Sequence, residues 1–190
     1  MKMNFLSTFA VAVSLALASA PAWALQPFNA QYDAAYKGIA ANGSMSLSQQ
    51  GARWTYSMNI SNSMAPLSQS TVFSEVAGKY IPLGSSDRTN YLMQRKSVVT
   101  HYDWRAMLAR WTGDVKAKRA GPVKMQSGDM DGLLINLALA RDAAAGKAMN
   151  YRMLENGRAK PLSYRIVGKE KLTIAGKPVI ATKVSNTSGD

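Results

Sequence analysis

The sequence holds few side chains that could carry out covalent or acid–base chemistry. His101 is its only histidine, and it lies in a predicted strand beside Tyr102 and Asp103. A histidine and a carboxylate that share a cleft can move protons, but a lone strand histidine is more often a packing or surface residue. Neither a G-x-S-x-G nor an S-x-x-K motif accompanies it. We therefore expect no catalytic residues and no enzyme, unless His101 and Asp103 form a buried pair in a cleft.

Metal and cofactor sites have no better support. One histidine and no cysteine cannot supply a transition-metal ligand shell, and the acidic residues are dispersed. Asp129 and Asp131 are close in sequence, but helix capping explains the first and compensation of the helix dipole explains the second. The 14 glycines stand singly at turns, so there is no glycine-rich phosphate loop. We expect no metal and no cofactor. A hydrolase with paired carboxylates would need two acids from distant strands.

The elements that would position any site are mostly strands. Polar and apolar residues alternate along most of the chain, and turn residues recur at short intervals. The clearest strand is "RWTYSMNI" at 53–60, whereas "LSQSTVFSEV" and "SSDRTNYLMQ" are weaker. This pattern predicts a mainly β fold, an antiparallel meander that forms a curved sheet or a partly open β-barrel with one covering α-helix.

The covering helix is predicted from Asp129 to Ala145, with Asp129 as its N-cap. Its apolar stripe consists of Met130, Leu133, Leu134, Leu137 and Ala138. The stripe must cover apolar surface, and we favour a lid over the concave side of the sheet rather than a membrane-binding helix.

Aromatic and methionine side chains could line a ligand pocket, although their period-two placement also fits the core faces of strands. Ring stacking on a sugar is the other use of such aromatics. The candidate ligand-lining residues are Trp54, Tyr56, Met58, Trp104, Leu133 and Leu137.

The first 24 residues have the pattern of a secretory signal peptide. Lys2 precedes the apolar run "FLSTFAVAVSLALA", and small residues at Ala22 and Ala24 form an A-x-A cleavage pattern. The run is short for a membrane span and no stop-transfer segment follows, so a retained anchor is disfavoured. No cysteine follows that could take a lipid. We expect export to the periplasm, removal of residues 1–24 and a soluble single domain at 25–190.

The charge is strongly basic, with 23 lysines and arginines against 11 acidic residues and a formal net charge of +12. Most of these cations are dispersed, as on a solvated face, and only "KAKR" is a cluster. Lys116, Lys118 and Arg119 could therefore contact an anionic surface such as lipid head groups or lipopolysaccharide phosphates. Nucleic acid is not expected as a partner in the exported compartment, where no recognition motif supports it.

Several segments together resemble the bacterial envelope family known only as domain of unknown function 3108. They are "PFNAQYDAAYKGI" at 27–39, "GSMSLSQ" at 43–49, "YDWRAMLA" at 102–109, Asp131 with the "GLLINLALARDAAAGK" that follows, and the hairpin "YRIVGKEKLTIAGKPVIATKV" at 164–184. The hairpin carries Val167, Gly168, Glu170 and Gly176 in the places the family leads us to expect. The resemblance implies an exported antiparallel β-protein and no reaction.

Family members usually continue beyond this hairpin into a strand with a tryptophan and a proline-containing close. That segment is absent, so we expect a chain truncated at its C-terminus, whose last strand presents an unpaired edge.

Two functions follow as hypotheses. The leading one is a periplasmic protein that binds a hydrophobic or amphipathic envelope component in its interior. The alternative is a structural or interaction module that docks on an envelope protein or on an anionic surface polymer such as lipopolysaccharide. The sequence indicates no oligomeric state.

Overall fold

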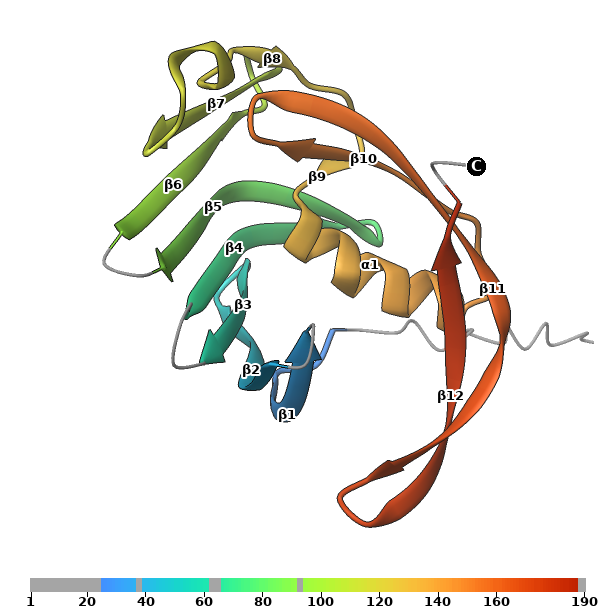
Figure 1. Ribbon diagram of the computed structural model, residues 1–190. Helices are drawn as coiled ribbons and strands as arrows, with labels where there is room; N and C mark the ends of the chain where they lie inside the picture. The colour runs from blue at the N-terminus through green and yellow to red at the C-terminus, as the bar shows by residue number, and fades with distance from the viewer. Residues whose placement is uncertain (1–24, 37–38, 62–65, 92–93, 188–190) are drawn as a thin grey trace, which may run out of the picture.

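A computed structural model describes residues 25–36, 39–61, 66–91 and 94–187 of the chain. The predicted signal peptide at 1–24 lies outside the described residues. The predicted fold class is confirmed: the chain is mainly β, with an antiparallel meander, one α-helix and a sheet that is not closed. The helix lies between this curved sheet and a second, smaller sheet (Figure 1).

The large sheet consists of eight strands that pair in sequence order. They are β1 (Phe28–Tyr36), β2 (Ile39–Gln50), β3 (Arg53–Ser61), β4 (Leu67–Val76), β5 (Lys79–Tyr91), β6 (Gln94–Asp103), β7 (Leu108–Gly113) and β8 (Val123–Lys124). All seven pairings are antiparallel. Alternate side chains on each strand therefore face the concave side, where α1 lies.

The second sheet has four strands in the order β12, β11, β10, β9. They are β9 (Asp129–Met130), β10 (Met149–Glu155), β11 (Arg158–Ile174) and β12 (Lys177–Asn186). The long strand β11 passes through Gly168 without a break. Its register with β12 shifts between Ile166 and Gly168, as in a β-bulge.

Helix α1 (Gly132–Ala144) begins later than predicted. Its N-cap is Asp131, whose carboxylate accepts a 2.8 Å hydrogen bond from the Leu134 amide. The prediction of Asp129 as the cap is wrong because that carboxylate accepts instead from Arg152 of β10, at 2.6 Å. Asp129 belongs to β9, which pairs in parallel with β10 and so cannot enter the helix.

The main core lies between the large sheet and α1. Its buried members include Trp54, Phe73 and Tyr80 from the strands, and Leu134 and Ala138 from the helix. The predicted apolar stripe of the helix thus does cover the concave face of the sheet. A second buried cluster lies at the other end of that sheet and contains Val98, Tyr102, Ala109, Trp111, Met125 and Leu154.

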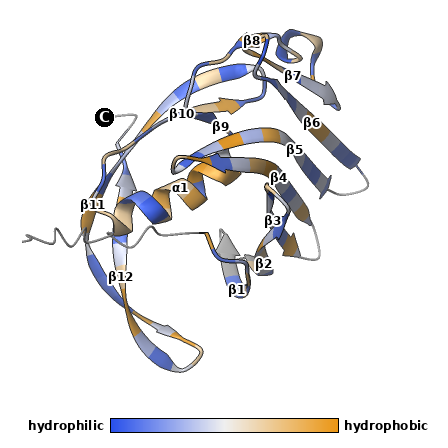
Figure 2. Cartoon of the chain, turned by 180° about the vertical axis from the view of Figure 1, so that it is seen from behind, coloured by the Kyte–Doolittle hydropathy of each residue, from blue (hydrophilic) through white to orange (hydrophobic). Residues whose placement is uncertain are grey.

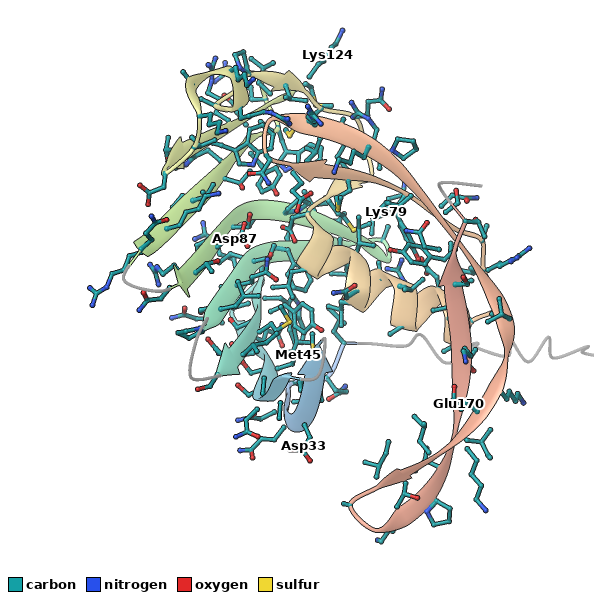
Figure 3. All side chains as sticks on the ribbon, viewed as in Figure 1. Asp33, Met45, Lys79, Asp87, Lys124 and Glu170 are labelled. Carbon is teal, nitrogen blue, oxygen red and sulfur yellow. The ribbon has the colours of Figure 1, made fainter. Side chains whose placement is uncertain are left out.

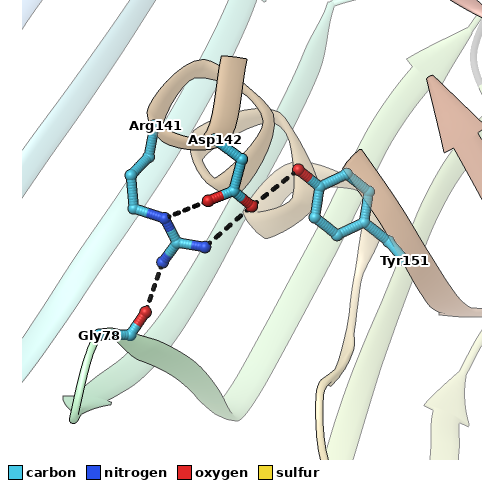
Figure 4. Close-up of polar contacts among 4 residues, drawn as sticks. All are labelled: Gly78, Arg141, Asp142 and Tyr151. Atoms are coloured by element: carbon cyan, nitrogen blue, oxygen red, sulfur yellow. Dashed lines mark hydrogen bonds and ion pairs between the residues drawn. The ribbon is translucent and has the colours of Figure 1, made fainter. Parts of the chain in front are cut away.

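The C-terminal end of α1 is held by a polar cluster (Figure 4). Arg141 donates two hydrogen bonds to the Asp142 carboxylate, at 2.7 and 3.0 Å, and a third to the Gly78 carbonyl, at 2.6 Å. The Tyr151 hydroxyl donates to Asp142 at 3.0 Å, and the Arg141 guanidinium lies 4.4 Å from the ring centroid of Tyr80. These contacts tie the helix to both sheets.

Candidate functional site

A cavity of about 380 Å³ opens on the concave face of the large sheet. Strands β4 to β7 form one wall, and the first turns of α1 and the turn between β10 and β11 form the other. Its polar lining residues are Gln69, Thr71, Ser85, Asp87, Thr89, Lys96, Thr100, Asp131, Asn136, Glu155 and Asn156. Its apolar lining residues include Leu67, Val98, Trp111, Leu133 and Leu154.

Three rows of cross-strand neighbours build the sheet side of the cavity. The innermost row is buried and consists of Thr71, Ser85, Thr100 and Trp111. The middle row is Gln69, Asp87 and Val98, and the outer row is Leu67, Thr89 and Lys96. Cross-strand partners share one face of a sheet, so β4, β5 and β6 each contribute alternate side chains.

Asp131 lies at the inner end of the cavity and caps α1. Its carboxylate accepts a hydrogen bond from the Thr71 hydroxyl at 3.0 Å and lies 3.4 Å from the Tyr102 hydroxyl. Burial raises the pKa of Asp131 to about 6, although the bonds from Leu134 and Thr71 lower it. Burial also raises the pKa of Tyr102, so its hydroxyl remains a donor toward the carboxylate.

Asp87 is the second inward-facing carboxylate. The Gln69 amide donates a 2.7 Å hydrogen bond to it. Burial raises the pKa of Asp87 despite this bond. Figure 3 labels this residue on β5 of the large sheet.

The charges around the cavity are mainly acidic. Asp87, Asp131 and Glu155 line it, and Lys96 is the basic residue of its lining. Glu155 is exposed and lies 3.5 Å from Lys160. A protein with a net charge of +12 thus presents carboxylates and hydroxyls at this position. The arrangement can accept hydrogen bonds from an ammonium or from hydroxyl groups, while Val98, Leu133 and Leu154 offer apolar contact.

Comparison with known proteins identifies the family of this chain. The sequence profile of a family described as "Protein of unknown function (DUF3108)" matches residues 31–190. The chain belongs to this family. The resemblance seen in the sequence is thereby confirmed. No curated protein and no solved structure matches the chain.

The residues predicted to line a ligand site do not all reach the cavity of this DUF3108 member. Leu133 lines it. Trp54 and Tyr56 are buried in the main core, and Met58 and Leu137 pack against that core. Trp104 packs on the second cluster and donates a 2.6 Å hydrogen bond to the Pro82 carbonyl. Their role toward a ligand stays a prediction.

The residues that could have indicated catalysis lie on the outside of this family member. His101 is exposed, and its Nε2 lies 3.1 Å from the Thr112 hydroxyl. Asp103 is also exposed and accepts a 2.8 Å hydrogen bond from the Ala106 amide in the turn after β6. The two residues are adjacent outward positions of one strand and do not form a buried pair.

The predicted basic cluster lies on a 3₁₀ turn, η1 (Ala117–Arg119), between β7 and β8. Lys116 and Lys118 are exposed. Arg119 is half-buried and donates a 3.2 Å hydrogen bond to the Asn156 carbonyl. Asn156 also lines the cavity, so the cluster and the cavity share the β10–β11 turn.

Within residues 25–187, leaving aside the gaps given above, no group of three or more histidine, aspartate or glutamate side chains could hold a metal ion. The helices of these described residues lack the length and hydropathy of a membrane span.

Sequence reasoning missed the polar floor of the cavity. The strands that carry it are those whose alternation was weakest, because Gln69, Thr71, Ser85, Asp87 and Thr89 occupy inward positions where core residues were expected. This departure from the apolar pattern was the available signal. Polar inward positions on two consecutive strands indicate a solvated or ligand-filled interior rather than a poor strand.

Proposed function

We propose that this protein is an exported periplasmic binding protein that holds a small amphipathic molecule in the cavity between β4–β7 and the start of α1. The observation that carries the proposal is the buried polar floor around Asp131, where Thr71, Ser85 and Thr100 form one inward row next to the apolar main core. Hydroxyls and carboxylates keep acceptor capacity beyond the bonds they make to one another, so a row of inward hydroxyls beside two carboxylates on a cavity wall favours a bound polar group.

The chemistry of the lining selects the ligand class. Asp87, Asp131 and Glu155 supply acceptors, and Lys96 is the lining cation. A ligand whose polar end carries an ammonium or several hydroxyl groups would find acceptors there, whereas a carboxylate or phosphate would meet like charge. The apolar part of the ligand would contact Leu133. A volume of about 380 Å³ suits one small molecule.

The site proposed here differs from the aromatic interior that the sequence suggested. Trp54 and Tyr56 already pack in one buried cluster with Leu134 and Ala138 of α1. A lipid chain placed there would have to displace the helix. The proposal therefore keeps an amphipathic ligand but moves its polar end to the cavity.

The proposal is one of binding and not of catalysis, because His101 and Asp103 share no cleft.

A second candidate function is docking on an anionic polymer through Lys116, Lys118 and Arg119, which lie on one short turn. Reversal of these three charges to glutamate should abolish retention on immobilised lipopolysaccharide. Unchanged retention would remove the cluster as a docking patch.

The test of the cavity is native mass spectrometry of the chain recovered gently from the periplasmic fraction of an expressing bacterium. Recovery there with Leu25 as the first residue would support export, and retention of residues 1–24 would oppose it. We expect a co-purified small molecule on the wild-type chain. Thr89→Trp fills the cavity from β5 and should abolish binding of the small molecule. The control Ser48→Trp, on the exposed side of β2, should still carry that molecule. A wild-type chain free of adduct, or an adduct equal in all three, would contradict the proposal.

A further inference from the structure

The hairpin of β11 and β12 extends away from the body of the protein (Figure 1). From Arg165 to Ile180 every residue is exposed. The side chains of this segment point into open space on both faces, and Figure 3 labels Glu170 there. The segment contributes nothing to the two buried clusters, which end on β11 at Tyr164. A paired β-ribbon without a core to cover needs another reason for its apolar side chains.

Exposed apolar residues concentrate on this hairpin. Six of the ten exposed large apolar side chains in the described chain belong to it: Ile166, Val167, Leu172, Ile174, Val179 and Ile180. Leu172 and Val179 are direct cross-strand partners, and Ile174 lies two residues nearer the tip on the same face. Ile180 lies on the other face of the ribbon, where Lys171 is its cross-strand partner. Each face of the outer part of the ribbon therefore carries apolar side chains next to a lysine.

Positive charge accompanies these residues. Residues 164–186 carry five basic side chains, Arg165, Lys169, Lys171, Lys177 and Lys183, and one acidic side chain, Glu170. Glu170 lies 3.2 Å from Lys183. Figure 2 shows the result as hydrophobic and hydrophilic segments that alternate along both strands. Two copies of so basic a ribbon would repel one another, so the charge argues against pairing with a second copy.

We infer that this hairpin docks the protein on the surface of an anionic lipid bilayer. Leu172 and Ile174, the last two large apolar residues of β11 before the Ala175–Gly176 turn, are two residues apart. At about 3.4 Å per residue they span about 7 Å. This length matches the depth of about 5–10 Å to which interfacial segments bury apolar groups. Lys169 and Lys171 follow behind them at the level of lipid phosphates, and Lys177 near the tip can extend its stem back to the same level.

Apolar residues at the tip favour a bilayer over a dissolved polyanion, which offers charge but no apolar phase. The site is independent of the cavity. The proposed ligand site and the hairpin are formed by different residues, so each can fail without the other.

The test is sedimentation of the full chain with vesicles of phosphatidylglycerol and phosphatidylethanolamine, against vesicles of phosphatidylcholine alone. We expect binding to the anionic vesicles that weakens with added salt. Lys171→Glu with Lys177→Glu, and separately Leu172→Ser with Ile174→Ser, should each lower the binding at least ten-fold. Wild type and variants are recovered from the same periplasmic fraction, and their first residue is checked to be the same by mass spectrometry.

The matched control is the turn between β4 and β5. Val76, Ala77, Gly78 and Lys79 repeat the apolar–Ala–Gly–Lys order of the hairpin tip, and Ala77 and Ala175 share a φ of 49°. Val76→Ser with Lys79→Glu should leave vesicle binding unchanged. Unaltered far-ultraviolet circular dichroism would show that the variants fold.

Three results would overturn the inference. The wild-type chain does not bind anionic vesicles, or the two hairpin variants bind them as well as wild type. Alternatively, the hairpin variants dissolve a concentration-dependent oligomer without any vesicle effect, which would make the hairpin a contact between copies of the chain.

Discussion

Asp131 offers the sharpest test of the polar floor, because its burial couples stability to pH. The ordinary pKa of the carboxyl is 3.8, and in the fold it rises to about 6. The folded state therefore keeps the proton at pH values where the unfolded chain has released it. The stabilisation from this difference is fully present below about pH 4 and is lost as the pH rises through about 6.

The substitution Asp131→Asn removes the titration while keeping an oxygen that can cap the Leu134 amide. A shift of roughly two pKa units at about 1.4 kcal/mol each corresponds to about 3 kcal/mol. We therefore expect the stability of the variant, relative to wild type, to increase by about 3 kcal/mol between pH 4 and pH 7. Titrations of other groups occur in both proteins and largely cancel in this difference.

The assay is urea unfolding of both proteins at several pH values across that window. Thr71→Val is the companion variant, because loss of the hydroxyl that donates to the carboxylate should raise the pKa of Asp131 further and move the midpoint of the effect upward. A difference between wild type and Asp131→Asn that stays constant with pH would refute the reasoning. So would a difference of opposite sign, since it would mean that the fold stabilises the ionised carboxylate.

Two further predictions concern the frame that holds the site. Ala77 has a φ of 49°, a left-handed conformation that costs an alanine about 1 kcal/mol or more. Ala77→Asn should therefore raise the free energy of unfolding by about 1 kcal/mol. A lower midpoint of thermal unfolding would contradict this prediction. Asp142→Ala leaves the half-buried Arg141 and the Tyr151 hydroxyl without their shared acceptor and should cost about 2–3 kcal/mol in urea unfolding. Tyr151→Phe removes one of these bonds and should cost about 1 kcal/mol, and equal losses in the two variants would contradict the account of the cluster.

The sequence predicted the meander and the covering helix because both depend on local patterns. Trp54 and Tyr56 alternate with polar residues on a strand that is buried on one face, and Leu133, Leu134 and Ala138 recur at helical spacing. Such periodicities follow from backbone geometry, so they survive without knowledge of neighbours.

The start of the helix and the cavity depend on contacts between distant residues. Asp129 and Asp131 are equivalent as sequence-level caps, and the choice between them is made by Arg152, which lies 23 residues beyond Asp129 and binds it. The cavity likewise forms because Thr71 meets Asp131 across 60 residues. No local pattern encodes either contact, and the polar inward residues of β4 and β5 therefore appeared only as weak strands.

The central claim is that the cavity binds an amphipathic molecule through donors on its polar end. The most direct measurement of this claim compares the affinities of three ligands with eight-carbon chains: octylamine, octyl glucoside and octanoate. Binding is followed by the fluorescence of Trp111 on the cavity wall. The variant Trp111→Phe identifies the part of the signal that comes from this residue. We predict that octylamine and octyl glucoside bind more tightly than octanoate, and that Asp87→Asn weakens octylamine alone. Equal affinities for all three, or tightest binding of octanoate, would contradict the account.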